Sequence, residues 1–254
     1  MLPSNVEGVE AQLIIDSGIV QIKHTGGSWT PAQNNMTLHQ SDSIKTGTNA
    51  SASVVFFESS TIRLANNTEI TLVELFEQEG LTKVTIQQDE GKTWNTVLKI
   101  SGIDDYEVQT PTTVASVRGT AFYVNVQTTG RTHVGVGHGV VNVSSTKNGQ
   151  IIHTIQVNTN ESVIIDPDTI EQPLEIKPFE KDDWILHNQE LDDENVNAIK
   201  QDIFARLQPY IPELKERYGV TDQELDVLID GYIRGYFNLP SETPQWIKDI
   251  IEKS

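Results

Sequence analysis

The chain has 254 residues, with 36 Asp and Glu against 18 Lys and Arg, a formal net charge of −18, and no cysteine. A surface this acidic repels polyanions, so neither a nucleic acid nor an anionic membrane surface is expected as a partner, and disulfides and thiolate metal sites are excluded. No run of about 20 apolar residues occurs, so no membrane span is predicted, and the first residues, MLPSNVEGVE, lack the features of a secretion signal.

After a tail over residues 1–11, residues 12–166 are rich in short runs in which apolar and polar residues alternate. Examples are GIVQIKH (18–24), SASVVFF (51–57) and AFYVNVQ (121–127). A period of two with many β-branched residues is typical of strands, and clusters such as TGG, PAQNN and TKNG predict the turns between them. The spacing predicts an all-β domain over 12–166, either a sandwich, a barrel or a solenoid.

The composition changes near residue 167. Residues 167–190 contain three prolines and many charges with little periodicity, which predicts a connecting strap over the β domain. Residues 191–254 have helical periodicity, which predicts a separate α-helical C-terminal domain.

Four amphipathic helices are expected in that C-terminal domain. Asp192 or Asp193 can cap the first of them, and Thr221 with Glu224 forms a capping box for the third. We expect the helices at 195–208, at 211–219, from Thr221 onward, and from Thr243-Pro244 onward. Each needs a surface on which to bury its apolar face.

Residues able to do chemistry are scattered along the chain. The motifs of metalloproteases, serine hydrolases, P-loops and dinucleotide sites are all missing from the sequence. The adjacent acids at 104–105, 182–183 and 192–193 are expected in turns and helix caps, and a calcium loop at 166–171 is an alternative that lacks the EF-hand spacing. No catalytic residue, no metal site and no cofactor are therefore predicted.

Several segments, in order, resemble the FecR domain family over residues 18–190. The most specific is TPTTVASVRGTAFYV (110–124), which resembles the family pattern T-P-x-x-x-A-x-V-R-G-T-x-F. The others are SDSIKTGTNASASVVF (41–56), ESSTIRLANNTEITL (58–72), GKTW (91–94), GRTHVGVGHGVVNV (130–143) and DDWILHNQELD (182–192). The C-terminal helices are not part of this pattern.

The resemblance implies an extracytoplasmic, non-catalytic domain with a perturbed β-helix or solenoid-like fold. The family's N-terminal anti-sigma domain and membrane helix have no counterpart in this sequence, so an anti-sigma role is not carried over. Ser41 and Glu58-Ser59 stand where the family has Gly and Asp-Gly, which affects the expected loop geometry there.

The function expected from the resemblance is protein–protein interaction at the cell surface or in the periplasm, in sensing, scaffolding or assembly. A glycan-binding module or adhesin is an alternative, with Trp29 and Trp94 as candidate surface aromatics, although a tryptophan is more often an anchor in a core or between domains. A polysaccharide-active enzyme is a further alternative, which would need two or more acids that converge in a groove.

The central motif is expected to be structural and not a ligand site. Because an isolated buried guanidinium would cost several kcal/mol, Arg118 is predicted to pair with a carboxylate, and Asp42 is the favoured acid. Gly119 is expected to permit a bulge or a close backbone approach. The motif consists of Thr110, Pro111, Val117, Arg118, Gly119, Thr120 and Phe122, together with Asp42.

Overall fold

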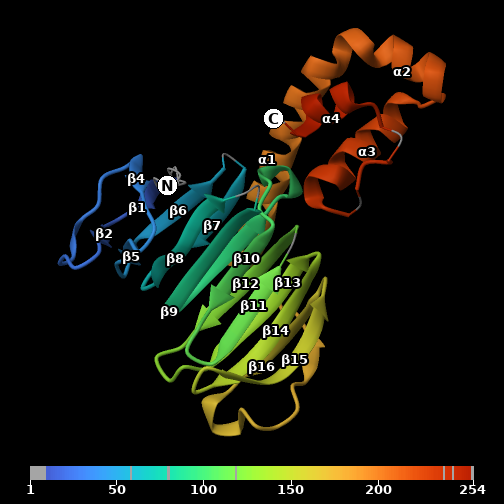
Figure 1. Cartoon of the computed structure of the whole chain (residues 1–254). Helices are drawn as coiled ribbons and strands as arrows, with labels where there is room; N and C mark the ends of the chain where they lie inside the picture. Colours follow the sequence, from blue (N-terminus) through green and yellow to red (C-terminus); the bar gives the residue numbers. More distant parts are fainter. Residues whose placement is uncertain are drawn as a thin grey trace, which may run out of the picture. The chain divides into compact units, whose positions relative to one another are not determined.

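The computed structural model describes residues 10–57, 59–78, 81–117, 119–236, 238–241 and 243–252. The chain forms two compact units, and Figure 1 shows their strands and helices, most of them labelled. The β unit comprises Met1–Val97 and Ser101–Glu180, and the helical unit comprises Leu98–Ile100 and Lys181–Ser254. Most of the predicted tail over 1–11 lies outside the described residues.

The β unit contains seventeen described strands and one short 3-10 helix, and a second short 3-10 helix spans the division between the two units. The first nine strands are β1 (Ala11–Ser17), β2 (Val20–Lys23), β3 (Thr30–Pro31), β4 (Met36–Leu38), β5 (Ser43–Thr46), β6 (Ser51–Phe56), β7 (Ser60–Leu64), β8 (Glu69–Gln78) and β9 (Leu81–Val97). The remaining strands are β10 (Asp105–Gln109), β11 (Thr113–Val117), β12 (Thr120–Val126), β13 (Thr132–His138), β14 (Val140–Lys147), β15 (Gln150–Asn158), β16 (Glu161–Ile165) and β17 (Ile176–Pro178). The short helices are η1 (Lys99–Ser101), which begins in the helical unit, and η2 (Pro167–Thr169).

These strands form two sheets that share β9. Sheet A has the order β4-β1-β6-β7-β9-β12-β13-β16-β17. Sheet B has the order β3-β2-β5-β8-β9-β10-β11-β14-β15. The first half of β9 pairs with β8 in sheet B, and its second half pairs with β12 in sheet A.

The mainly β fold predicted from the sequence is confirmed, but the predicted β-helix or solenoid is not shown. A β-helix stacks parallel coils, whereas the pairings described here are antiparallel apart from the parallel pair β9–β10. The chain instead crosses repeatedly from one antiparallel sheet to the other. The period-two pattern is common to both architectures, so the sequence did not distinguish them.

One hydrophobic core combines residues from both sheets. Phe56 and Phe122 of sheet A each meet Tyr106 of sheet B edge to face, with ring centroids 6.4 and 6.3 Å apart. All three rings are almost fully buried. Edge-to-face pairs of this kind add about 0.5–1.5 kcal/mol to the burial of apolar area.

A chain of buried hydrogen bonds runs beside these rings. The Tyr106 hydroxyl donates to Asn95 Oδ1 at 2.8 Å, and Asn95 Nδ2 donates to Thr93 Oγ1 at 2.9 Å. The Thr93 hydroxyl donates to Gln88 Oε1, and Gln88 Nε2 donates to the carbonyl of Gly91. Because each of these polar groups is paired, the core avoids the penalty for an unsatisfied buried group.

Gly91 is the point at which β9 passes from sheet B to sheet A. Its φ is +92°, and a Cβ there would lie 2.5 Å from Thr68 Cα and 2.6 Å from Asn67 O. Only glycine combines this backbone conformation with so close an approach. The GKTW motif therefore marks a corner of the fold and lies within β9, not at the start of a strand.

The strap after β16 crosses the outer face of sheet A. Strand β17 pairs with β16, and the ring of Phe179 lies on Gly135, where any Cβ would overlap it. Phe179 also contacts Tyr123 and His133, with ring centroids 5.8 and 6.1 Å away. Burial lowers the pKa of His133 below its ordinary value, and the charge of Arg131 adds to this effect.

The helical unit contains α1 (Asp183–Leu207), η3 (Gln208–Tyr210), α2 (Ile211–Tyr218), α3 (Asp222–Arg234) and α4 (Gln245–Glu252). Four helices were predicted, but α1 begins well before residue 195, because Asp182 caps it by accepting from the Ile185 N–H at 2.9 Å. Asp192 and Asp193 therefore lie inside α1 and do not cap a helix. None of the described helices is long and apolar enough to cross a membrane.

A local signal defines the start of α3. The predicted capping box is present, since the Glu224 N–H donates to Thr221 Oγ1 and the Thr221 N–H donates to the Glu224 carboxylate. In α1, Val196, Ile203 and Leu207 are almost fully buried. These residues join the core of the helical unit, in which α1 packs on α3 and α4.

Candidate protein-interaction surfaces

The central motif forms a turn and a crossing between the two sheets. Thr110 and Thr113 close a hairpin between β10 and β11, in which Thr110 N donates to Thr113 O at 2.8 Å, and Pro111 lies exposed at its tip. Thr110 Oγ1 lies 3.0 Å from Thr132 Oγ1. The motif then continues through Val117 into β12, where Thr120 and Phe122 are buried.

Gly119 lies between β11 of sheet B and β12 of sheet A. Its φ is +66°, a conformation that glycine adopts without strain. The backbone approach around it is close, because a Cβ on Gly139 would lie 2.9 Å from the Gly119 carbonyl oxygen. Gly119 thus takes part in a close backbone approach, at a crossing between the sheets.

Asp42 is buried and hydrogen-bonded. One carboxylate oxygen lies 2.7 Å from His24 Nδ1, and the other accepts from the backbone N–H of His39 at 2.9 Å. Arg118, its predicted partner, lies outside the described residues, so that ion pair stays a prediction. The bonds to His24 and His39 were not foreseen, because the short loop around His39 and the strand that ends near His24 meet only in the folded chain.

The two candidate surface tryptophans have different environments. Trp94 has a relative exposure of 0%, so the prediction that it is a surface aromatic is wrong: on β9 it lies in the middle of sheet A, between β7 and β12. Trp29 is half-buried, and Lys23 Nζ lies 4.8 Å from its ring centroid. A glycan ligand at Trp29 stays a prediction.

Acidic and histidine side chains do not gather into a metal site in the part of the chain that the structure describes. A polar cavity of about 540 Å³ lies under the strap and includes Arg131 and Asp166. Asp166 accepts from the Asp168 N–H at 3.0 Å and lies 3.7 Å from Arg131 Nε, so it caps η2 and forms an ion pair. Glu175 also lines this cavity and lies 3.5 Å from Lys177 Nζ; the alternative of a polysaccharide-active enzyme stays a hypothesis.

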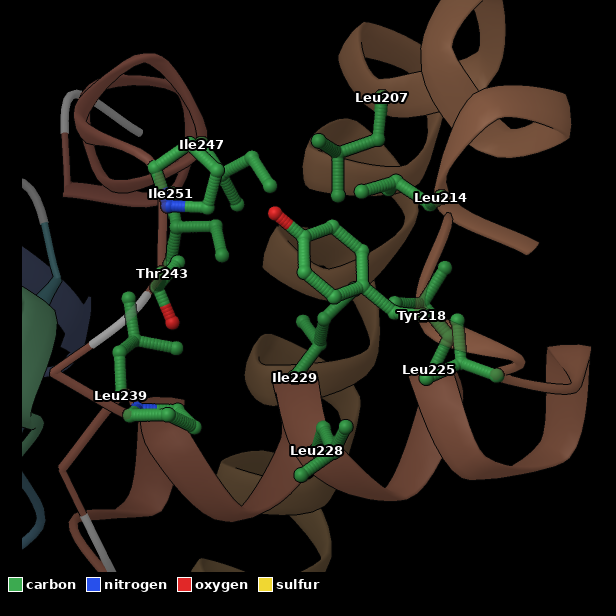
Figure 2. A pocket seen from close by; sticks show the side chains of 13 residues that line it. Leu207, Leu214, Tyr218, Leu225, Leu228, Ile229, Leu239, Thr243, Ile247 and Ile251 are labelled. Atoms are coloured by element: carbon green, nitrogen blue, oxygen red, sulfur yellow. The ribbon is translucent and has the colours of Figure 1, made fainter. Parts of the chain in front are cut away.

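An apolar pocket of about 300 Å³ lies within the helical unit (Figure 2). The pocket lining is apolar except for two side chains that carry a hydroxyl group, Tyr218 and Thr243. Thr243 lies in the loop before α4. Figure 2 shows the Tyr218 ring extending into the pocket toward Ile247. The pocket is lined by Leu207, Leu214, Tyr218, Val220, Leu225, Leu228, Ile229, Leu239, Pro240, Thr243, Pro244, Ile247 and Ile251.

The rim of this pocket is exposed and apolar. Tyr218, Val227 and Leu228 have relative exposures of 45, 60 and 37%. Leu228 lines the pocket, and Val227 lies beside it on α3, in a shallow hollow that Tyr218, Leu228 and the polar Gln223 and Glu224 also line. Leu228 is therefore both part of the pocket lining and partly exposed.

Ion pairs brace the helix that carries the rim. Lys200 of α1 lies 3.1 Å from the Asp226 carboxylate, and Arg234 lies 2.9 Å from Asp193 and 3.1 Å from Asp230. Although burial alone would lower the pKa of the Arg234 guanidinium, Asp230 and Asp193 raise it above its ordinary value. The pairs Lys200–Asp226 and Arg234–Asp193 join α3 to α1, whereas the pair Arg234–Asp230 lies within α3.

Comparison with known families places one match in the β unit. Residues 42–142 match the family model described as FecR protein. The resemblance inferred from the sequence is therefore confirmed over these residues, and the C-terminal helices lie outside the match. No curated protein matches the chain.

Two crystal structures of a protein from Parabacteroides distasonis, provisionally assigned as an anti-sigma factor, are similar to this chain. Each shares 18% sequence identity and a TM-score of 0.43. The similarity covers 54% of this chain and 59% of that protein, so the chain spans less than two thirds of its length.

Proposed function

We propose that this chain, whose residues 42–142 match the FecR family, is a non-catalytic regulatory protein that binds a protein partner outside the cytoplasm. The family match supports a regulatory interaction role in preference to a catalytic one. Because fold alone does not determine function, the proposal also needs a surface suited to a partner. The helical unit provides one.

The apolar pocket with its exposed rim is the observation that carries the proposal. Contiguous exposed apolar side chains on a soluble protein mark interaction sites, and Tyr218, Val227 and Leu228 form such a rim. A pocket this apolar offers water few hydrogen bonds, so an apolar side chain is the better occupant. An amphipathic helix that inserts one bulky apolar residue would fill it.

The charge of the helical region indicates the character of that helix. Residues 181–254 contain 16 Asp and Glu against 8 Lys and Arg. Opposite charge on the partner accelerates association and excludes acidic competitors. We therefore infer that the partner helix has basic residues flanking its apolar face.

The test uses a fluorescent 18-residue peptide of Leu and Lys, with Leu at helical spacing, and measures its binding by anisotropy. Leu228→Asp should weaken binding at least about tenfold, equivalent to about 1.4 kcal/mol, because it places a charge on the pocket rim. Leu186→Asp is the matched control, since Leu186 is 45% exposed on α1 and does not line the pocket. Equal affinity of wild type and a folded Leu228→Asp variant would show that the pocket is not the docking site.

The extracytoplasmic location needs a separate measurement. The chain should be degraded when protease is added to spheroplasts, while a cytoplasmic marker protein survives. Protection of the chain together with the cytoplasmic marker would contradict this part of the proposal and leave the docking site open to its own test.

A further inference from the structure

The edges of the two sheets differ greatly in length. Three of the four described edge strands have only two or three residues, and two of these contain a proline: β3 includes Pro31 and β17 includes Pro178. The fourth, β15, has nine residues, Gln150–Asn158. Short strands and prolines prevent an edge from pairing with another chain, so β15 is the one among these four edge strands that lacks this protection.

The composition of β15 also favours pairing. Its sequence, QIIHTIQVN, has no Asp, Glu, Lys, Arg, Pro or Gly. Charged residues are the usual protection of an edge strand, and uncharged β-branched runs are the segments that associate when left uncovered. Ile151 is 65% exposed. A strand of this kind is a liability unless a partner covers it.

Hydrogen bonds show which backbone groups of β15 face the open side. His153 N donates toward β14, to Ser145 Oγ, whereas Asn158 N donates away from β14, to the Glu161 carboxylate. In β14, the Thr146 N–H donates to Thr112 O and therefore points away from β15. Since the direction alternates along an antiparallel strand, the N–H and C=O groups of Thr154 and Gln156 face outward.

We propose that this open edge of β15 binds an extended segment of a protein partner, which adds a strand to sheet B. Only an extended backbone presents donors and acceptors with the spacing that Thr154 and Gln156 require. This site lies in the β unit, so it is distinct from the helical pocket of the proposed function and does not depend on it.

Charge favours a basic partner segment over a second copy of this chain. Two copies would each bring a net charge of −18, and the self-repulsion opposes close association. Two acidic residues also lie near β15: the Glu161 carboxylate contacts Asn158 at the end of the strand, and Glu171, whose carboxylate pairs with Lys147 at 2.6 Å, has its backbone carbonyl 3.0 Å from His153 Nε2. Lys or Arg residues flanking the bound strand would lie near these acids.

The test uses a labelled peptide, Lys-Lys-Thr-Val-Thr-Val-Thr-Lys-Lys, in anisotropy titrations with the full chain. Gln156→Pro removes one outward N–H without removing any N–H that donates to β14, and an edge strand tolerates proline in that position. We expect this variant to bind at least about tenfold more weakly than wild type. Gln156→Thr keeps the N–H and should bind within about twofold of wild type.

Hydrogen exchange locates the bound peptide. The amides of Thr154 and Gln156 should exchange more slowly when it is present, and a version with Glu in place of Lys should bind more weakly at low salt. The proposal is overturned if Gln156→Pro, with an unchanged circular dichroism spectrum, binds the peptide like wild type, or if these two amides gain no protection.

Two further measurements separate other outcomes. A dimer seen by light scattering that Gln156→Pro dissolves would show that a second copy occupies the edge, which would overturn the basic-partner proposal. Leu228→Asp should leave binding of this peptide unchanged, so failure of the helical docking site and failure of the β15 site are distinguishable.

Discussion

The two units of this chain are built by different kinds of contact. In the β unit, Phe56, Tyr106 and Phe122 meet across two sheets although they are far apart in sequence. In the helical unit, Thr221 and Glu224 define the start of α3 within a single turn. The β unit therefore depends on many distant contacts that form together, whereas the helical unit depends more on local signals.

The two cores also differ in completeness. The core of the β unit contains a continuous chain of hydrogen bonds from Tyr106 to Gln88. The core of the helical unit leaves an apolar pocket with an exposed rim. Under the two proposals above, the β unit offers a partner its backbone edge, while the helical unit offers apolar side chains.

The largest effect is expected at the corner of β9. Gly91→Ala forces a Cβ against Thr68 at a φ of +92° and should lower the free energy of unfolding of the β unit by about 4 kcal/mol. Gly26→Ala is the control: its φ is +70° with nothing within 4 Å, and it should cost about 1 kcal/mol. Urea denaturation measures both, and equal losses would show that the close approach to Thr68 is unimportant.

A smaller effect is expected from the buried hydrogen-bond chain. Tyr106→Phe leaves Asn95 Oδ1 without its donor and should destabilise the β unit by about 2 kcal/mol. Tyr210→Phe, at an exposed position of the helical unit, should change the free energy of unfolding little. A neutral Tyr106→Phe variant would mean that the chain of hydrogen bonds contributes no net stability.

A local change should affect only the helical unit. Thr221→Ala removes the capping box of α3 and should cost about 1 kcal/mol, whereas Thr221→Ser keeps the hydroxyl and should retain most of it. Hydrogen exchange should become faster in α3 and stay unchanged in β9. Faster exchange in both units would contradict the view that the helical unit depends on local signals and the β unit on contacts between distant residues.

The smallest effect is a pH dependence from His133. Its pKa is lowered from 6.5 in the folded chain, so the unfolded chain binds the proton more readily. The stability that this difference provides is complete above pH 6.5 and is lost as the pH falls below that value through the lowered pKa. His133→Gln should reduce the slope of stability against pH in this window, as measured by thermal unfolding. An unchanged slope would show that other titrating groups cause the pH dependence.

Local patterns in the sequence determined much of this protein. Period-two alternation predicted the strands, and the 3.6-residue period with the Thr221–Glu224 capping box predicted the helices, because both signals act within one element. The motif TPTTVASVRGTAFYV led to the FecR family, which the match over residues 42–142 confirms. The earlier start of α1 was missed because Asp192 and Asp193 resemble a cap as closely as Asp182, the residue that caps it.

Only the tertiary structure decided how these elements combine. Alternation does not say which strands pair, so the choice between a β-helix and two antiparallel sheets depended on contacts between distant residues. The same is true of the burial of Trp94, the partners of Asp42 and the apolar pocket. An open edge at β15 is likewise a property of the whole sheet, because whether a strand has one neighbour or two is decided by the rest of the chain.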